Sequence, residues 1–240
     1  MIPPQTTRRG SRMTWHREFW QAFNDPLLRF FFMWGGRNGG RSHAVSRWIA
    51  LQATKKRQRV LCVRWNLVSS TESMKTDIRN GLAEAGALHL WKTPTSGNFT
   101  CANGSVIMFA GLFGSKGLRS LTDIDLVWAE EAQYIRNPEW RDFTYTFLRK
   151  PGLKLYVTGN AQFDFDPVYE WCQERKDLPH ATWLYTNYKT NWRHLTPDER
   201  DEIARAKATM PDVYDNDWLG HPLHQTHPCL LYTSPSPRDS

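Results

Sequence analysis

Apolar runs alternate with amphipathic stretches along most of this chain. Five mostly apolar runs are found at residues 30–34, 60–64, 106–110, 124–129 and 153–158. Residues 71–85 have a helical pattern, and between the first two runs one helix face is formed by Val45, Trp48, Ile49 and Ala53. Runs that are apolar on both faces and separated by helices predict an α/β fold with a mostly parallel central sheet flanked by helices.

The two ends of the chain depart from this central pattern. Residues 1–28 predict a basic arm and a short helix, one face of which carries Trp15, Phe19, Trp20 and Phe23. Another helix is predicted at 196–210, with a capping sequence formed by Thr196, Pro197 and Glu199. We expect residues 29–222 to form one domain and residues 223–240 to form a tail.

The first apolar run leads into a glycine-rich segment, Gly35-Gly36-Arg37-Asn38-Gly39-Gly40-Arg41-Ser42. The segment fits the phosphate-binding template G-x-x-x-x-G-K-[ST], except that Arg41 stands at the lysine position. Its glycines let the backbone turn tightly, and a helix that begins near Ser42 directs the positive end of its dipole at the same centre. Strand, loop and helix together predict a nucleotide-triphosphate site, with a structural turn as the alternative.

Two adjacent glutamates, Glu130 and Glu131, follow the run at residues 124–129 in the pattern of a Walker B element. Phosphoryl transfer needs a cation on the phosphate oxygens and a group that positions the attacking water. We expect Glu130 to hold Mg²⁺ together with Ser42, and Glu131 to orient the water. Alternation along a strand is expected to turn the two side chains in different directions. A charged strand end without chemistry is the alternative.

Polar residues follow the apolar runs at three places: the glycine loop, Glu130-Glu131 and Thr158-Gly159-Asn160. Ligands of parallel sheets bind beyond the carboxyl ends of the strands. We therefore expect these three segments to meet in one site.

Charge and composition narrow the choice of partners. The net charge is +7, and residues 1–60 hold twelve Lys and Arg against two acidic residues. This excess favours a polyanion such as nucleic acid, with a solvated surface as the alternative. No apolar run approaches the roughly 18 residues of a membrane helix, and the polar first twelve residues predict no secretory signal. The four widely spaced cysteines are expected to be buried thiols.

The ordered set of motifs resembles the ATPase domain of phage terminase large subunits of the PBSX type, over roughly residues 28–222. The resemblance rests on the loop at 35–42, on Val63-Arg64, and on segments 103–105, 109–112, 116–120, 128–132, 158–160 and 214–220. It implies a RecA-like P-loop NTPase fold. It also implies a motor that uses ATP and Mg²⁺ to move double-stranded viral DNA into a procapsid.

The resemblance also assigns roles to individual residues. It implies that the nucleotide-binding Walker A loop consists of Gly35, Gly36, Arg37, Asn38, Gly39, Gly40, Arg41 and Ser42. It implies that Glu130 is the magnesium carboxylate, Glu131 the catalytic carboxylate, and Arg37 a residue that stabilises transition-state charge. Thr158, Gly159 and Asn160 form the coupling motif that senses the γ-phosphate. Arg64 and Arg119 are weaker candidates for a phosphate or DNA contact, with a surface ion pair as the alternative for each.

The implied partners are double-stranded DNA, a portal protein, a terminase small subunit and further copies of the chain in a ring. The implied location is the host cytoplasm, with no membrane and no place in the mature virion. Large subunits of this kind carry a C-terminal nuclease, which we do not expect within these 240 residues. Residues 229–240 resemble translated adapter sequence, and we interpret them as non-native; an ordinary flexible C-terminus is the alternative.

Two other hypotheses about function remain open, and Arg41 and the length of the chain bear on them. Arginine binds phosphate as a planar fork, whereas lysine acts as a compact point charge, so ATP binding is compatible with reduced turnover. A non-catalytic nucleotide- or DNA-binding module with a degenerate Walker A is therefore one alternative. Another P-loop DNA-dependent ATPase, such as a helicase-like or DNA-partitioning protein, is the second, although helicases carry a second RecA-like module that 240 residues cannot hold.

Overall fold

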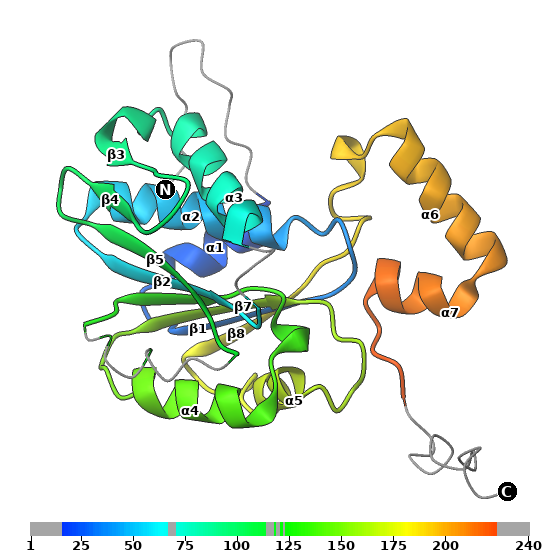
Figure 1. Ribbon diagram of the computed structural model, residues 1–240. Coiled ribbons are helices and arrows are strands. Elements are labelled where there is room, and N and C mark those ends of the chain that lie inside the picture. The colour runs from blue at the N-terminus through cyan, green and yellow to red at the C-terminus, as the bar shows by residue number, and fades with distance from the viewer. Residues whose placement is uncertain (1–15, 67–70, 114–117, 119–120, 122, 225–240) are drawn as a thin grey trace, which may run out of the picture.

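A single eight-stranded sheet organises the molecule (Figure 1). The computed structural model describes residues 16–66, 71–113, 118, 121 and 123–224. The strand order is β3-β4-β5-β2-β6-β7-β1-β8. The pairs formed by β5, β2, β6, β7, β1 and β8 are all parallel, and only the pairings of β3 and β4 are antiparallel. The predicted fold class, a mostly parallel sheet between helices, is confirmed.

The five predicted strands are all present, with small differences at their ends. They are β1 (Phe30–Trp34), β2 (Arg59–Arg64), β5 (Val106–Gly111), β6 (Leu126–Ala129) and β7 (Lys154–Gly159). The sequence pattern did not identify the strands at the two edges of the sheet. These are β3 (Trp91–Lys92), β4 (Phe99–Cys101) and β8 (Ala181–Tyr185).

Helices cover both faces of the sheet. Those on one face are α1 (Arg17–Asn24), α2 (Arg41–Lys55) and α3 (Thr71–Glu84), and those on the other are α4 (Asn137–Phe147) and α5 (Pro167–Gln173). Alternation along β1 supplies both cores: Phe31 packs with the first group, and Phe30 and Phe32 with the second. Because every residue of β1 is buried, the run looks continuously apolar in the sequence.

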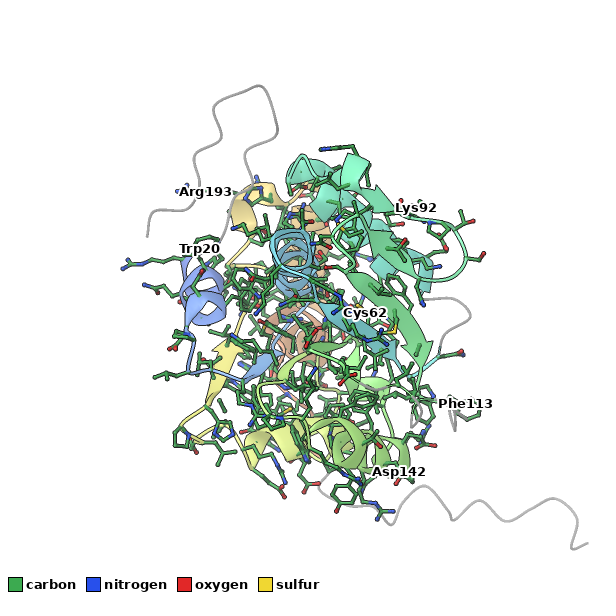
Figure 2. All side chains as sticks on the ribbon, turned by 90° about the vertical axis from the view of Figure 1, so that its left-hand side faces the viewer. Trp20, Cys62, Lys92, Phe113, Asp142 and Arg193 are labelled. Atoms are coloured by element: carbon green, nitrogen blue, oxygen red, sulfur yellow. The ribbon has the colours of Figure 1, made fainter. Side chains whose placement is uncertain are left out.

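The N-terminal helix belongs to the main core. Phe19 and Phe23 of α1 are almost fully buried, and Phe23 contacts the rings of Phe31, Trp48 and Tyr156. Residues 1–15, with Trp15, lie outside the described residues, as do Arg119 and the tail 225–240. Cys62, Cys101 and Cys172 are buried as expected, and Figure 2 shows Cys62 between the layers of side chains. Cys229 lies outside the described residues.

A small helical lobe stands beside the sheet (Figure 1). It contains α6 (Pro197–Thr209), α7 (Pro211–Val213) and the π-helix η5 (Tyr214–Leu219). The capping box predicted for α6 is present, because Thr196 Oγ1 accepts from the Glu199 N–H and Glu199 Oε2 accepts from the Thr196 N–H. Three further short helices in the part of the chain that the structure describes are η1 (Leu88–Leu90), η3 (Ala132–Tyr134) and η4 (Trp192–His194). Among the described residues, no helix is long and apolar enough to span a membrane.

Candidate nucleotide site at the carboxyl edge of the sheet

The glycine-rich loop connects β1 to α2, as predicted. Gly40 is the N-cap of α2 with φ of 75°, a conformation that glycine adopts without the steric penalty of a side chain. At the other end of the loop, a Cβ on Gly36 would lie 1.9 Å from the carbonyl oxygen of Trp218 in η5. The loop is therefore held between the sheet and the helical lobe, at a spacing that excludes a side chain at Gly36.

A partly buried hydrogen bond joins the loop to the carboxylate pair. Ser42 Oγ donates to Glu130 Oε1 at 2.9 Å, although 88 residues separate them in the chain. The Glu130 N–H donates to Val63 O at 2.9 Å, which extends the pairing of β6 with β2 beyond Ala129. Burial raises the pKa of Glu130 above its usual value, while Arg64 and Ser42 lower it in part. The predicted meeting of Ser42 and Glu130 is present in the structure.

Arg64 lies against both carboxylates. Its Nε forms a buried ion pair with Glu130 Oε2, and its Nη1 lies 3.4 Å from Glu131 Oε2. The ion pair weighed as the alternative for Arg64 is present, but it is buried rather than on the surface, because Arg64 is only 8% exposed. The two glutamates differ in burial, since the Glu131 side chain is 46% exposed, but both reach the same guanidinium. The expectation that they point apart is therefore only partly correct.

The backbone at Glu131 explains this convergence. Glu131 has φ of 50° and ψ of 45°, so it is left-handed and no longer continues the strand. Non-glycine residues rarely adopt this conformation, and such residues concentrate at functional sites. Strand alternation, on which the expectation was based, does not apply after Ala129.

The segment Thr158-Gly159-Asn160 ends β7 next to the carboxylates. Thr158 Oγ1 accepts from Trp128 Nε1 at 2.9 Å, so this hydroxyl is used behind the site. Asn160 Nδ2 donates to Asp217 O at 3.3 Å. Asn160 Oδ1 is buried and has no hydrogen-bond partner among the described residues. Asn160 is therefore the residue of this segment whose side-chain oxygen has no partner among the described residues, and the residue lines the cavity described below.

The two loop arginines lie in different surroundings. The Arg37 side chain is 63% exposed and pairs with Asp217 at 3.2 Å, and its backbone N–H donates to Asp217 O at 2.7 Å. Arg41 turns inward, and its Nη1 donates to the carbonyl oxygens of Gly36 and Thr186. Asp217 was not identified from the sequence, although the segment 214–220 belongs to the ordered motif set.

One cavity of about 470 Å³ brings the predicted segments together. It is lined by Arg37, Asn38, Arg41, Ser42, Glu130, Glu131, Gln133, Tyr134, Thr158, Gly159, Asn160, Gln162 and Asp217. Gln133 is a member that the sequence did not indicate, and its Oε1 accepts from the Asn160 N–H at 3.2 Å. The loop, the carboxylates and residues 158–160 therefore face a single space at the carboxyl ends of β1, β6 and β7.

Several basic residues counted toward a polyanion surface are used inside the protein. Arg29 donates to the carbonyl oxygens of Lys150 and Leu153, and Arg47 forms an ion pair with Glu84. Arg41 binds backbone carbonyls in the same way, whereas the exposed Arg37 pairs with Asp217 at the surface. The exposed basic residues left at the end of α2 are Lys55, Lys56 and Arg57.

The sheet order, the loop between β1 and α2 and the carboxylates after β6 define a RecA-like α/β fold, as in large terminase ATPase domains. A family model described as phage terminase large subunit matches residues 28–227. The chain therefore belongs to the phage terminase large subunit family.

Solved structures with the same fold are similar at low sequence identity. The large terminase of a thermophilic bacteriophage has a TM-score of 0.69 at 12% identity, over 85% of this chain and 53% of that chain. The large terminase ATPase domain of Thermus phage P74-26 has a TM-score of 0.62 at 12% identity, over 85% of this chain and 92% of that domain. The chain thus spans about half the length of the first of these two proteins.

A stretch of 93 residues is 32% identical to membrane-bound lytic murein transglycosylase F of Shewanella woodyi. It covers 37% of this chain and 19% of that protein, too small a share of either to indicate a family.

Proposed function

We propose that this chain is the ATP-hydrolysing motor domain of a terminase large subunit, which moves double-stranded viral DNA into a procapsid. The observation that carries the proposal is the hydrogen bond between Ser42 and Glu130 inside the cavity that Glu131 and Asn160 also line. It joins the loop that would bind phosphate to the carboxylates that would act on it. The large terminase of the thermophilic bacteriophage has been solved in complex with ATP-γ-S and with ADP, which supports the same nucleotide here.

The residues present fit a nucleotide with Mg²⁺. Arg41 and Ser42, the first two residues of α2, line the cavity, so the positive end of the helix dipole lies where phosphate is favoured. Ser42 Oγ and the Glu130 carboxylate are the oxygen donors that magnesium prefers, so they would hold the ion directly or through water. When bound, Mg²⁺ neutralises charge on the phosphate oxygens.

The protein's own groups then divide the remaining tasks. Glu131 is half-exposed at the cavity, so its carboxylate accepts a hydrogen bond from the attacking water and orients it. Asn160 lines the same cavity at the end of β7, and its donor Nδ2 would contact the γ-phosphate in place of Asp217 O. Its unpaired Oδ1 is an acceptor and would accept a hydrogen bond from the attacking water. Arg37 supplies positive charge from the loop once its contact with Asp217 opens.

The proposed role in DNA packaging implies further partners. We propose double-stranded DNA as the polymer that is moved, with a portal protein, a terminase small subunit and other copies of this chain as the assembly. The host cytoplasm is the place where these components meet. The basic net charge supports contact with the DNA backbone, which is independent of base sequence.

The test is ATP turnover with Mg²⁺, with and without double-stranded DNA, in the unsubstituted chain and in Glu131→Gln. Because the amide cannot accept the water's proton, Glu131→Gln is expected to lose turnover, by at least about a hundredfold, while it still binds ATP. Glu170→Gln, an exposed glutamate in α5, is the matched control and should keep turnover.

Turnover unchanged in Glu131→Gln would remove this residue from its catalytic role. Binding of ATP without turnover by the unsubstituted chain, even with DNA, would favour the non-catalytic module. Turnover that DNA stimulates but that does not depend on a procapsid portal would favour another P-loop DNA-dependent ATPase.

A further inference from the structure

The arginine at the lysine position of the loop is anchored to two backbone carbonyls. Arg41 Nη1 donates to Gly36 O and to Thr186 O, each at 2.8 Å, and lies 3.3 Å from Thr186 Oγ1. Gly36 belongs to the loop, whereas Thr186 directly follows β8, the parallel neighbour of β1 at the sheet edge. One nitrogen of the guanidinium therefore ties the loop to the adjacent strand end.

The other nitrogens of the same guanidinium are available to a ligand. Arg41 lines the cavity with Ser42 and Glu130. Among the described residues, hydrogen bonds from Arg41 are made by Nη1 alone, so Nε and Nη2 keep their donors. Burial lowers the pKa of Arg41 to about 10, against the raising effects of Tyr185 and Glu130, so the group stays charged at neutral pH.

We propose that Arg41 acts on two sides: Nη1 fixes the loop to Thr186, and the remaining N–H groups of the same guanidinium bind the phosphates of the nucleotide. This inference rests on the proposed function and deepens it. It gives Thr186, which no motif includes, the part of a positioning residue through its backbone carbonyl. It also explains how a charged arginine is accommodated in a loop whose template carries lysine.

Side-chain length makes this arrangement specific for arginine. A lysine ends where Arg41 has Cζ, so its ammonium falls short of the Nη1 position by roughly one C–N bond, about 1.3 Å. From there, the two carbonyls lie beyond hydrogen-bond distance unless the ammonium moves away from the cavity. A planar guanidinium with five N–H donors binds the two carbonyls and the phosphates at the same time, whereas a lysine ammonium does not.

The first test compares Arg41→Lys with the unsubstituted chain, by the dissociation constant for ATP-γ-S with Mg²⁺ and by the melting temperature without nucleotide. The loss of two charge-assisted hydrogen bonds should weaken binding by about tenfold or more and lower the melting temperature by about 2–6 °C. Arg57→Lys, an exposed arginine after α2, is the matched control and should change neither quantity.

A second variant separates geometry from charge. Arg41→Ala should lose ATP-γ-S binding, and added guanidinium ion should restore more of it than added methylammonium at equal concentration. Equal restoration by both ions would overturn the inference, because a point charge would then be sufficient.

The outcomes of the first test also separate the inference from the function it rests on. If the unsubstituted chain binds ATP-γ-S and Arg41→Lys binds it as tightly with the same melting temperature, the two-sided role is wrong and the proposed function stands. If the unsubstituted chain does not bind ATP-γ-S, the proposed function fails, and with it the phosphate contact of Arg41.

Discussion

Replacing Arg64 by methionine tests whether the carboxylate pair depends on a buried cation. The substitution keeps most of the aliphatic stem but removes the guanidinium that lies between Glu130 and Glu131. Glu130 is 6% exposed, so its carboxylate would be left buried, with Ser42 as its remaining side-chain partner among the described residues. Removing one partner of a buried pair costs about 3–5 kcal/mol. For a domain of this size, that loss lowers the melting temperature by about 6–20 °C.

The pH dependence distinguishes a lost charge from a lost packing contact. Burial already raises the pKa of Glu130, and Arg64 is the main group that lowers it, so the pKa rises further in Arg64→Met. A carboxyl with a raised folded-state pKa destabilises the fold above that pKa, and the penalty disappears as the pH falls and the group takes up a proton. The deficit in melting temperature should therefore be large at about pH 8 and smaller at about pH 5.5.

Thermal unfolding of four proteins measures the effect: the unsubstituted chain, Arg64→Met, Glu130→Gln and the double variant. In the double variant no buried charge is left unpaired, so much of the lost stability should return. A deficit in Arg64→Met that is the same at both pH values, or that the double variant does not reduce, would refute the electrostatic account. Arg64 would then contribute through packing alone.

Two further predictions follow from the loop and from the basic residues. Gly36→Ala places a Cβ 1.9 Å from Trp218 O and should cost about 3 kcal/mol or more, whereas Gly97→Ala, at an open position, should cost about 1 kcal/mol. Equal melting temperatures for the two variants would show that η5 moves away from the loop freely. Affinity for double-stranded DNA should be independent of base sequence and fall steeply with salt, by a log–log slope of about 0.9 per phosphate contacted; a flat titration would argue against backbone binding.

Local sequence was sufficient to predict the centre of the site. Apolar runs identified β1, β6 and β7, because the central residues of these strands are apolar and buried on both faces. The residues that follow a buried parallel strand must lie at the carboxyl edge of the sheet, so the loop, Glu130 and Asn160 could be placed together before any contact was known. Strand order was not needed for this step.

The contacts around that centre depend on strand order and on distant segments. β8 lies beside β1 as an edge strand that is only partly buried, so its sequence, Ala-Thr-Trp-Leu-Tyr, lacks a continuous apolar run. Thr186 acquires its role only because β8 takes this place. Asp217 belongs to a π-helix, a rare element without a propensity signal. Neither residue carries a local pattern that indicates the loop as its partner.

Counting charge along the chain did not identify which basic residues lie on the surface. The basic excess in residues 1–60 includes Arg41, which binds backbone carbonyls, and Arg47, whose side chain is buried against Glu84. A guanidinium with five donors can satisfy buried carbonyls and carboxylates. An arginine in the sequence is therefore weaker evidence of an exposed positive charge than a lysine. The exposed Lys55 and Lys56 are better candidates for contact with a polyanion.

The strengths of the loop's contacts divide it into a fixed part and a part that can rearrange. On the inner side, Ser42 and Arg41 make hydrogen bonds to a buried carboxylate and to buried carbonyls, where each lost bond leaves a polar group without a partner. On the outer side, Arg37 pairs with Asp217 largely in solvent, and such pairs contribute only about 0–1 kcal/mol. A ligand phosphate at the loop can therefore replace Asp217 as the partner of Arg37 at little cost, while the contacts of Arg41 and Ser42 persist. Asp217 O also accepts from Asn160 Nδ2, so the same residue of η5 contacts both the outer side of the loop and the end of β7.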